Sequence, residues 1–137
     1  MTFLVERLAE LRRHVDHLRG LAPKVGDRFA IERDLSLHND VMFSLLMVAQ
    51  LVIDLAGELS ARRGDRFEDY TEAIRNLARD DRFPADLVLE LERIPGFRNV
   101  VIHEYVALDL DRVIEALHRL DPIDHFIAIV RDIERSA

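Results

Sequence analysis

Apolar side chains at the start of the chain recur with the period of an α-helix. Leu4, Leu8, Leu11, Val15 and Leu18 are spaced alternately by four and three residues, which places them in one stripe along a helix. The 137-residue chain has only five glycines and four prolines, and strand-like alternation of apolar and polar residues is absent. We therefore predict an all-α protein, an up-and-down bundle of about four to six helices.

Capping residues and helix breakers mark the expected boundaries. A first helix is expected over residues 2–21 and a second over residues 27–63, with Gly64 as its stop signal. The stretch 42–56 is apolar almost all round and should be the most buried part of the molecule. Caps and prolines delimit the later helices: Asp69 with Glu72, then Pro84, Pro95-Gly96, Asp109 and Pro122.

Length and composition narrow the class of protein. A chain of 137 residues predicts a single domain, residues 1–137. The absence of cysteine and of a secretory leader predicts a cytoplasmic location. Gln50 and Asp54 interrupt the longest apolar region, so we expect no membrane span. The net charge of −7 argues against an open surface for nucleic acid, although it permits a local basic cleft.

Four polar side chains between residues 98 and 105 form the candidate site. At about 100° per helical residue, Arg98, Asn99, His103 and Tyr105 occupy one side of the helix, with Val100 on the opposite side as a core anchor. The guanidinium of Arg98 can grip a phosphate through two hydrogen bonds. The imidazole of His103 can take up or release a proton near neutral pH. These groups suit metal-independent RNA cleavage, in which the ribose 2′-hydroxyl attacks its own phosphate.

Other interpretations of this cluster remain open at the level of sequence. The four side chains could be a structural polar network or a solvated helix face. They could also hold a nucleotide in a non-catalytic helical module that binds a nucleotidyltransferase partner. Incubation with RNA in the presence of a chelator would separate the ribonuclease from both alternatives.

The segment 97–109 resembles the Arg-x4-His-x-Tyr signature of the HEPN superfamily, and within it the HepT-like toxins. Those toxins show an apolar residue, Arg-Asn or Arg-Asp, three apolar residues, His-x-Tyr and an acidic residue four positions later, and each position matches here. Residues 49–55 look like the family's central helix and residues 67–77 like its connecting segment. The resemblance covers roughly residues 42–133, and Pro95 departs from the commonest pattern.

The resemblance implies a fold, an activity and two partners. It implies a helical bundle that forms a homodimer, with the two signature segments facing each other across a cleft. It implies an endoribonuclease that needs neither a metal nor a cofactor, in which His103 is the acid–base group, Arg98 binds phosphate, Asn99 orients His103 and Tyr105 contacts RNA. It also implies a minimal nucleotidyltransferase antitoxin, which in some pairs attaches AMP to the signature tyrosine, here Tyr105.

Several charged residues outside the signature have two interpretations each. Asp54 either supports Arg98 or His103 in the cleft, or faces solvent or pairs structurally with another arginine. His14 and His17 either share a metal or lie on a solvated helix face. His38, His118 and His125 are isolated in the sequence, so we assign them no role. Two arginine groups either form basic patches near RNA or solvated faces: Arg12, Arg13 and Arg19, and Arg62, Arg63 and Arg66.

Overall fold

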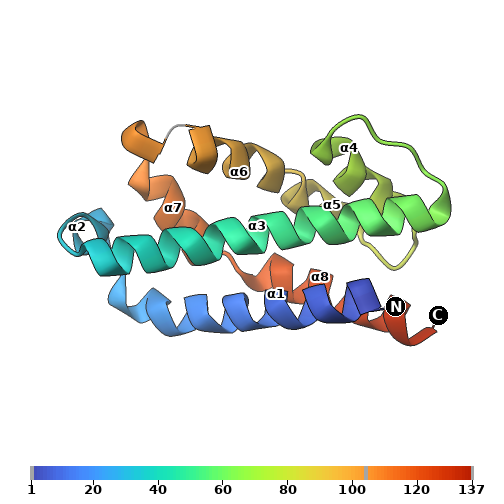
Figure 1. Cartoon of the computed structure of the whole chain (residues 1–137), viewed down its shortest axis with the longest axis horizontal. Helices are drawn as coiled ribbons and strands as arrows, with labels where there is room; N and C mark the ends of the chain where they lie inside the picture. The colour runs from blue at the N-terminus through green and yellow to red at the C-terminus, as the bar shows by residue number, and fades with distance from the viewer. Residues whose placement is uncertain (1, 104, 137) are drawn as a thin grey trace.

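A computed structural model describes residues 2–103 and 105–136. These residues form helices and no strand, which confirms the predicted all-α bundle. The long helices α1 (Thr2–Leu21) and α3 (Leu35–Arg63) lie side by side, and α8 (Asp121–Ser136) packs against α1 (Figure 1). The shorter elements are η1 (Ala22–Lys24), α2 (Arg28–Glu32), α4 (Tyr70–Arg75), η2 (Asn76–Arg79), α5 (Ala85–Leu91), α6 (Ile94–His103), η3 (Tyr105–Ala107) and α7 (Leu110–Leu117).

The region predicted as one helix over residues 27–63 is two helices. Asp27 caps α2 by accepting a hydrogen bond from the backbone N–H of Ala30 at 3.3 Å. The chain then breaks at Asp34, whose extended backbone (φ −134°) starts a new helix and whose carboxylate accepts from the N–H of Leu37 at 3.1 Å. Aspartate is among the best N-cap residues, so the cap at Asp34 starts a new helix where one continuous helix was predicted. Gly64 ends α3 in the left-handed conformation (φ 76°), as predicted.

The later boundaries follow the expected caps and prolines. Asp69 caps α4 by accepting from the N–H of Glu72 at 2.8 Å, while the Glu72 carboxylate accepts from the N–H of Glu68 at 2.7 Å. This exchange resembles a capping box displaced by one residue. Asp109 caps α7. Prolines 84, 95 and 122 each lie at or next to the start of a helix, where a missing N–H breaks no helical hydrogen bond.

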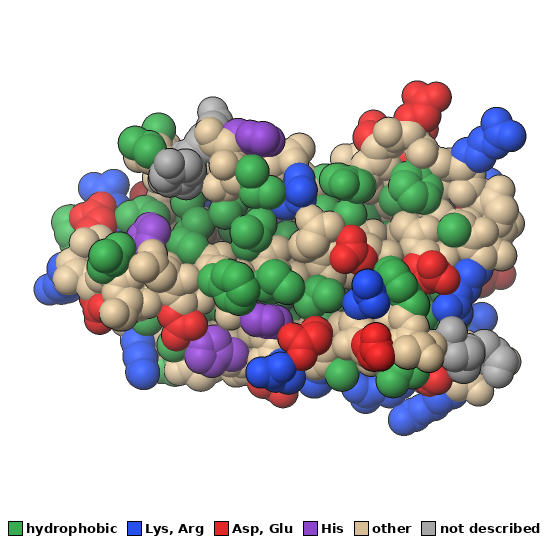
Figure 2. Space-filling view, in the orientation of Figure 1, with side chains coloured by type: hydrophobic (Ala, Val, Ile, Leu, Met, Phe, Trp, Pro, Cys, Tyr) green, Lys and Arg blue, Asp and Glu red, His purple; other side chains and the backbone are tan. Residues whose placement is uncertain are grey.

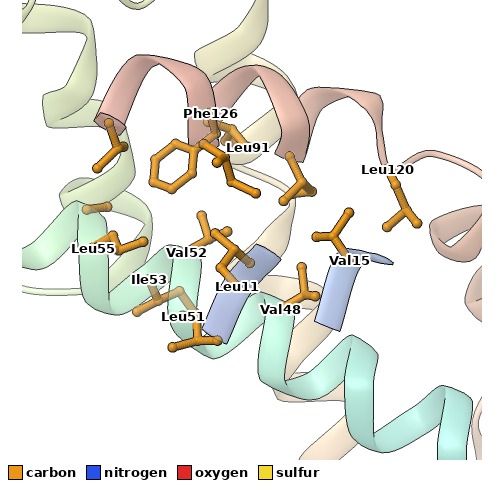
Figure 3. Close-up of a cluster of buried hydrophobic side chains, with 14 of the residues drawn as sticks. Leu11, Val15, Val48, Leu51, Val52, Ile53, Leu55, Leu91, Leu120 and Phe126 are labelled. Atoms are coloured by element: carbon orange, nitrogen blue, oxygen red, sulfur yellow. The ribbon is translucent and has the colours of Figure 1, made fainter. Parts of the chain in front are cut away.

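The hydrophobic core surrounds α3. Val48, Val52 and Leu55 of α3 face Leu11 of α1 and Phe126 of α8 (Figure 3). Each fully buried side chain of this size contributes about 1.5–3 kcal/mol relative to exposure. The prediction that residues 42–56 are the most buried stretch is confirmed for most of their length, but the side chain of Phe43 is 59% exposed.

Helix α3 is also long and apolar enough to cross a membrane, judged by length and composition alone. In the fold, 56% of its most apolar 18-residue window is buried inside the protein. Burial against the other helices is what the core helix of a bundle shows, and it accounts for the apolar run without a lipid phase.

Candidate active site

Helix α6 carries Arg98, Asn99 and His103 of the signature and packs on α3 (Figure 1). Val101 is buried, and Phe97 is partly buried against the core. Arg98 is half-buried at the edge of this packed face, whereas Asn99 and His103 are exposed. Val100, predicted as the core anchor, is only partly buried, because the packed face lies next to Arg98 on the helix and not opposite to it.

The guanidinium of Arg98 is held from α3. Its Nε donates to Oε1 of Gln50 at 2.7 Å, and Nε2 of Gln50 donates to Oδ1 of Asp54 at 2.8 Å. Asp54 therefore supports Arg98 through an intervening amide and forms no direct ion pair with it. Gln50 was not among the site residues predicted from the sequence. The available signal was a polar residue in an apolar run, one helical turn before Asp54 and thus on its face.

Two further groups contact Arg98. Its Nη1 donates to Oδ1 of Asn99 at 3.0 Å. Its Cζ lies 5.4 Å from the ring centroid of Tyr70, the first residue of α4, which is a cation–π distance. All three partners are neutral, so within the described residues no carboxylate neutralises the guanidinium. Arg98 is therefore oriented while its charge remains available to an anion.

Asn99 and His103 are not joined in the way expected from their spacing. The Asn99 amide oxygen accepts from Arg98, and no hydrogen bond links Asn99 with His103 in residues 2–103 and 105–136. His103 is the last residue of α6 and its side chain is exposed. The structure thus brings a fixed guanidinium and a solvent-facing imidazole to one helix, five residues apart.

Tyr105 follows after Glu104, which lies outside the described residues. Its backbone begins the short helix η3, so the α-helical geometry used to place Tyr105 beside Arg98 is described only as far as His103. The side chain of Tyr105 lies outside the described part of the chain, and its predicted position in the site stays a prediction.

A cavity of about 590 Å³ is bordered by α6 and by the helices packed around it. Phe97 and Val100 line it together with residues of α3, α7 and α8, and Arg93 and Arg119 stand at its border. These arginines pair with Glu115 and Glu90. The cavity is therefore a mainly apolar space behind α6 that includes neither Arg98 nor His103.

The histidines and arginines outside the signature have partners of their own. His14 hydrogen-bonds with Ser44 at 3.1 Å, and His17 hydrogen-bonds with Asp40 at 2.7 Å, so each imidazole is turned to a different residue of α3. Nε2 of His118 lies 3.0 Å from the carbonyl oxygen of Val25. Five of the six arginines considered as basic patches form ion pairs with carboxylates: Arg12, Arg13, Arg19, Arg62 and Arg63.

An all-helical bundle with Arg98 and His103 on one helix is the arrangement that the resemblance to the HEPN class of proteins implies. The model of the family described as Ribonuclease HepT-like matches residues 6–130. The chain therefore belongs to the ribonuclease HepT-like family. It is 22% identical to the mRNA nuclease HepT of Shewanella oneidensis over 130 residues, which are 93% of this chain and 96% of that protein.

Two solved structures share the fold. One is the tri-AMPylated HEPN toxin of Shewanella oneidensis in complex with an MNT antitoxin, with a TM-score of 0.83 and 21% identity over 96% of this chain and 98% of that one. The other is a toxin–antitoxin with AMP-PNP, with a TM-score of 0.84 and 20% identity over 96% of this chain and 99% of that one.

Proposed function

We propose that this chain is the toxin of a toxin–antitoxin pair, a cytoplasmic endoribonuclease that cleaves RNA with Arg98 and His103 in a cleft shared by two subunits. Membership of the ribonuclease HepT-like family supports the reaction class. The observation that carries the residue assignment is the contrast on α6: the guanidinium of Arg98 is fixed by neutral partners, while the imidazole of His103 is exposed to solvent.

The proposed reaction needs only groups of this chain and of the RNA. A 2′-hydroxyl loses its proton to an imidazole and its oxygen forms a bond to the adjacent phosphorus, while the bond from phosphorus to the 5′-oxygen breaks and that oxygen takes up a proton. His103 of the two subunits would act as base and acid. Arg98 would stabilise the charge that develops on the phosphate oxygens. The products would be a 2′,3′-cyclic phosphate and a 5′-hydroxyl.

Exposed apolar side chains around the signature support the dimer. Phe43 lies on α3 two turns before Gln50, on the same face, and is 59% exposed. Ile102 and Val106 flank His103 and are 37% and 88% exposed. Large apolar side chains grouped on one face are typical of a contact surface. A two-fold axis through this face would bring the two copies of His103 together.

The proposed partner is a minimal nucleotidyltransferase antitoxin that modifies Tyr105. The support comes from the Shewanella oneidensis toxin of the same fold, which is AMPylated and bound to an MNT antitoxin. If Tyr105 has the position beside Arg98 that the sequence predicts, AMP on its hydroxyl would add a bulky group and a negative phosphodiester next to the guanidinium. It would therefore exclude substrate phosphate by charge and by volume.

Expression in bacterial cells tests the proposed function. Wild-type protein is expected to arrest growth and degrade RNA, whereas Arg98→Ala and His103→Ala are expected to do neither at equal helix content by circular dichroism. Arg93→Ala is the matched control, because Arg93 is an exposed arginine just before α6 that pairs with Glu115. Co-expression with the nucleotidyltransferase should restore growth and add AMP mass to wild type but not to Tyr105→Phe. A His103→Ala protein that still degrades RNA would contradict the mechanism.

A further inference from the structure

Tyr70 lies next to the proposed phosphate ligand and has no role in the reaction described above. It is the first residue of α4 and its side chain is 42% exposed. One ring contact is with Arg98, whose Cζ lies 5.4 Å from the ring centroid. The phenol oxygen has no hydrogen-bond partner in the described part of the chain. The ring therefore presents accessible apolar surface beside a cation, and tyrosine is enriched at contact surfaces because it has an apolar ring and a polar hydroxyl.

A line of α3 residues connects Arg98 with this aromatic segment. Gln50, Asp54 and Gly57 are spaced by four and three residues and therefore share one face of α3. Gln50 holds Arg98. Gly57 lies beneath Phe67, whose Cζ is 3.4 Å from the point that a Cβ at residue 57 would occupy. A Cβ at residue 57 would make ordinary van der Waals contact with that ring, so the segment that precedes α4 packs directly over this face of α3.

The helices on the two sides of this line of α3 residues differ in chemistry. α6 contributes the polar side, with Arg98 and Asn99, and α4 with the preceding loop contributes exposed aromatic rings. Both helices pack on α3 and lie on the side away from α1 (Figure 1). Figure 2 shows hydrophobic side chains on the face between α6 and α4. A cationic group beside an accessible aromatic ring matches a nucleotide, which presents an anionic phosphate and a flat base.

We propose that Tyr70 is a base-stacking subsite for an unpaired nucleotide next to the phosphate bound by Arg98. This inference rests on the proposed ribonuclease function and extends it to the substrate class, single-stranded RNA. Stacking on a tyrosine ring accepts any base, since every base has a π-face. Tyr70 would therefore contribute affinity and local strand geometry and little sequence selectivity. It would also favour unpaired RNA, because bases in a duplex are already stacked.

Binding of RNA with a missing base tests the subsite directly. The parent protein is the His103→Ala variant, which should bind RNA without cutting it. One probe is a fluorescent single-stranded RNA. The other is the same RNA with one abasic nucleotide beside the position that the wild-type protein cuts. Adding Tyr70→Leu should weaken binding of intact RNA by about 5- to 150-fold, which corresponds to about 1–3 kcal/mol per stacked base. Tyr70→Phe keeps the ring and should bind like the parent.

The abasic RNA separates stacking from an indirect effect on Arg98. If Tyr70 stacks on the missing base, parent and Tyr70→Leu should bind abasic RNA equally well. Phe29→Leu is the matched control, since Phe29 is an exposed ring on α2 with Arg28 5.5 Å away, at the other end of α3 (Figure 1). An equal loss on both RNAs would overturn stacking and assign Tyr70 to positioning Arg98. Unchanged binding by Tyr70→Leu would overturn the subsite alone, whereas a parent that binds no RNA would overturn the proposed function as well.

Discussion

Replacement of Gln50 by alanine tests whether orientation of Arg98, and not only its charge, matters for RNA cleavage. The change removes the acceptor that lies 2.7 Å from Nε of Arg98 and disconnects Asp54 from the site. The guanidinium keeps its charge and its contacts with Asn99 and Tyr70. We therefore expect a weakened site and not an abolished one.

The size of the effect follows from these contacts. A hydrogen bond to a charged group contributes about 1.5–3 kcal/mol, and water partly replaces it at a half-buried position, so the loss of stability should be about 1–1.5 kcal/mol. That corresponds to a fall in Tm of roughly 5 °C for a chain of this length. Misplacement of a reacting group by about 1 Å can cost up to about 100-fold in rate, so kcat should fall by about 10- to 100-fold.

Steady-state cleavage of a fluorescent RNA, with the RNA in excess, measures this effect at a temperature at which both proteins are folded. Gln50→Ala should lower kcat much more than it raises KM. Asp54→Asn is the matched control, because an asparagine at 54 still offers Oδ1 to the Gln50 amide. Cleavage of RNA by Gln50→Ala at the wild-type rate would refute this role of Gln50.

Three further predictions concern assembly and stability. Phe43→Glu should convert a dimer to a monomer in light scattering, whereas Phe29→Glu should not; a dimeric Phe43→Glu protein would remove this face from the interface. Burial lowers the pKa of His14 below its ordinary value of 6.5, so the unfolded state binds the proton more readily than the folded state. The free energy of unfolding should therefore fall as the pH drops below about 6.5, and it should fall less in His14→Gln. Equal pH profiles of the two proteins in urea melts would contradict this. Gly64→Ala should lower the free energy of unfolding by about 1–2 kcal/mol in urea melts, because residue 64 has a positive φ. Gly20→Ala in α1 should instead stabilise the protein. An unchanged urea midpoint for Gly64→Ala would contradict this prediction.

Features set by local chemistry could be predicted from the sequence. Asp69, Asp109 and Gly64 end or begin helices as expected, because a cap depends on residues within one turn. The break at Asp34 was missed for a related reason. The apolar pattern continues across it, and the pattern alone does not reveal that a strong cap interrupts the backbone.

Features set by tertiary contacts could be predicted only in part. Helical spacing places Arg98, Asn99 and His103 relative to one another, but it does not say which side of α6 faces the core, so Val100 was given the role that Val101 has. Two of the three partners of Arg98 lie outside α6: Gln50 is 48 residues away on α3, and Tyr70 is on α4. Only the fold brings them to α6, and no spacing rule within one helix could identify them.

RNA cleavage by the purified protein in the presence of EDTA tests the central claim most directly. Wild type should cut single-stranded RNA into fragments that end in 2′,3′-cyclic phosphates, because the ribose 2′-hydroxyl is the nucleophile. His103→Ala and Arg98→Ala, with unchanged circular dichroism, should leave the RNA intact. Intact RNA after incubation with wild type, or the same fragments produced by His103→Ala, would contradict the account.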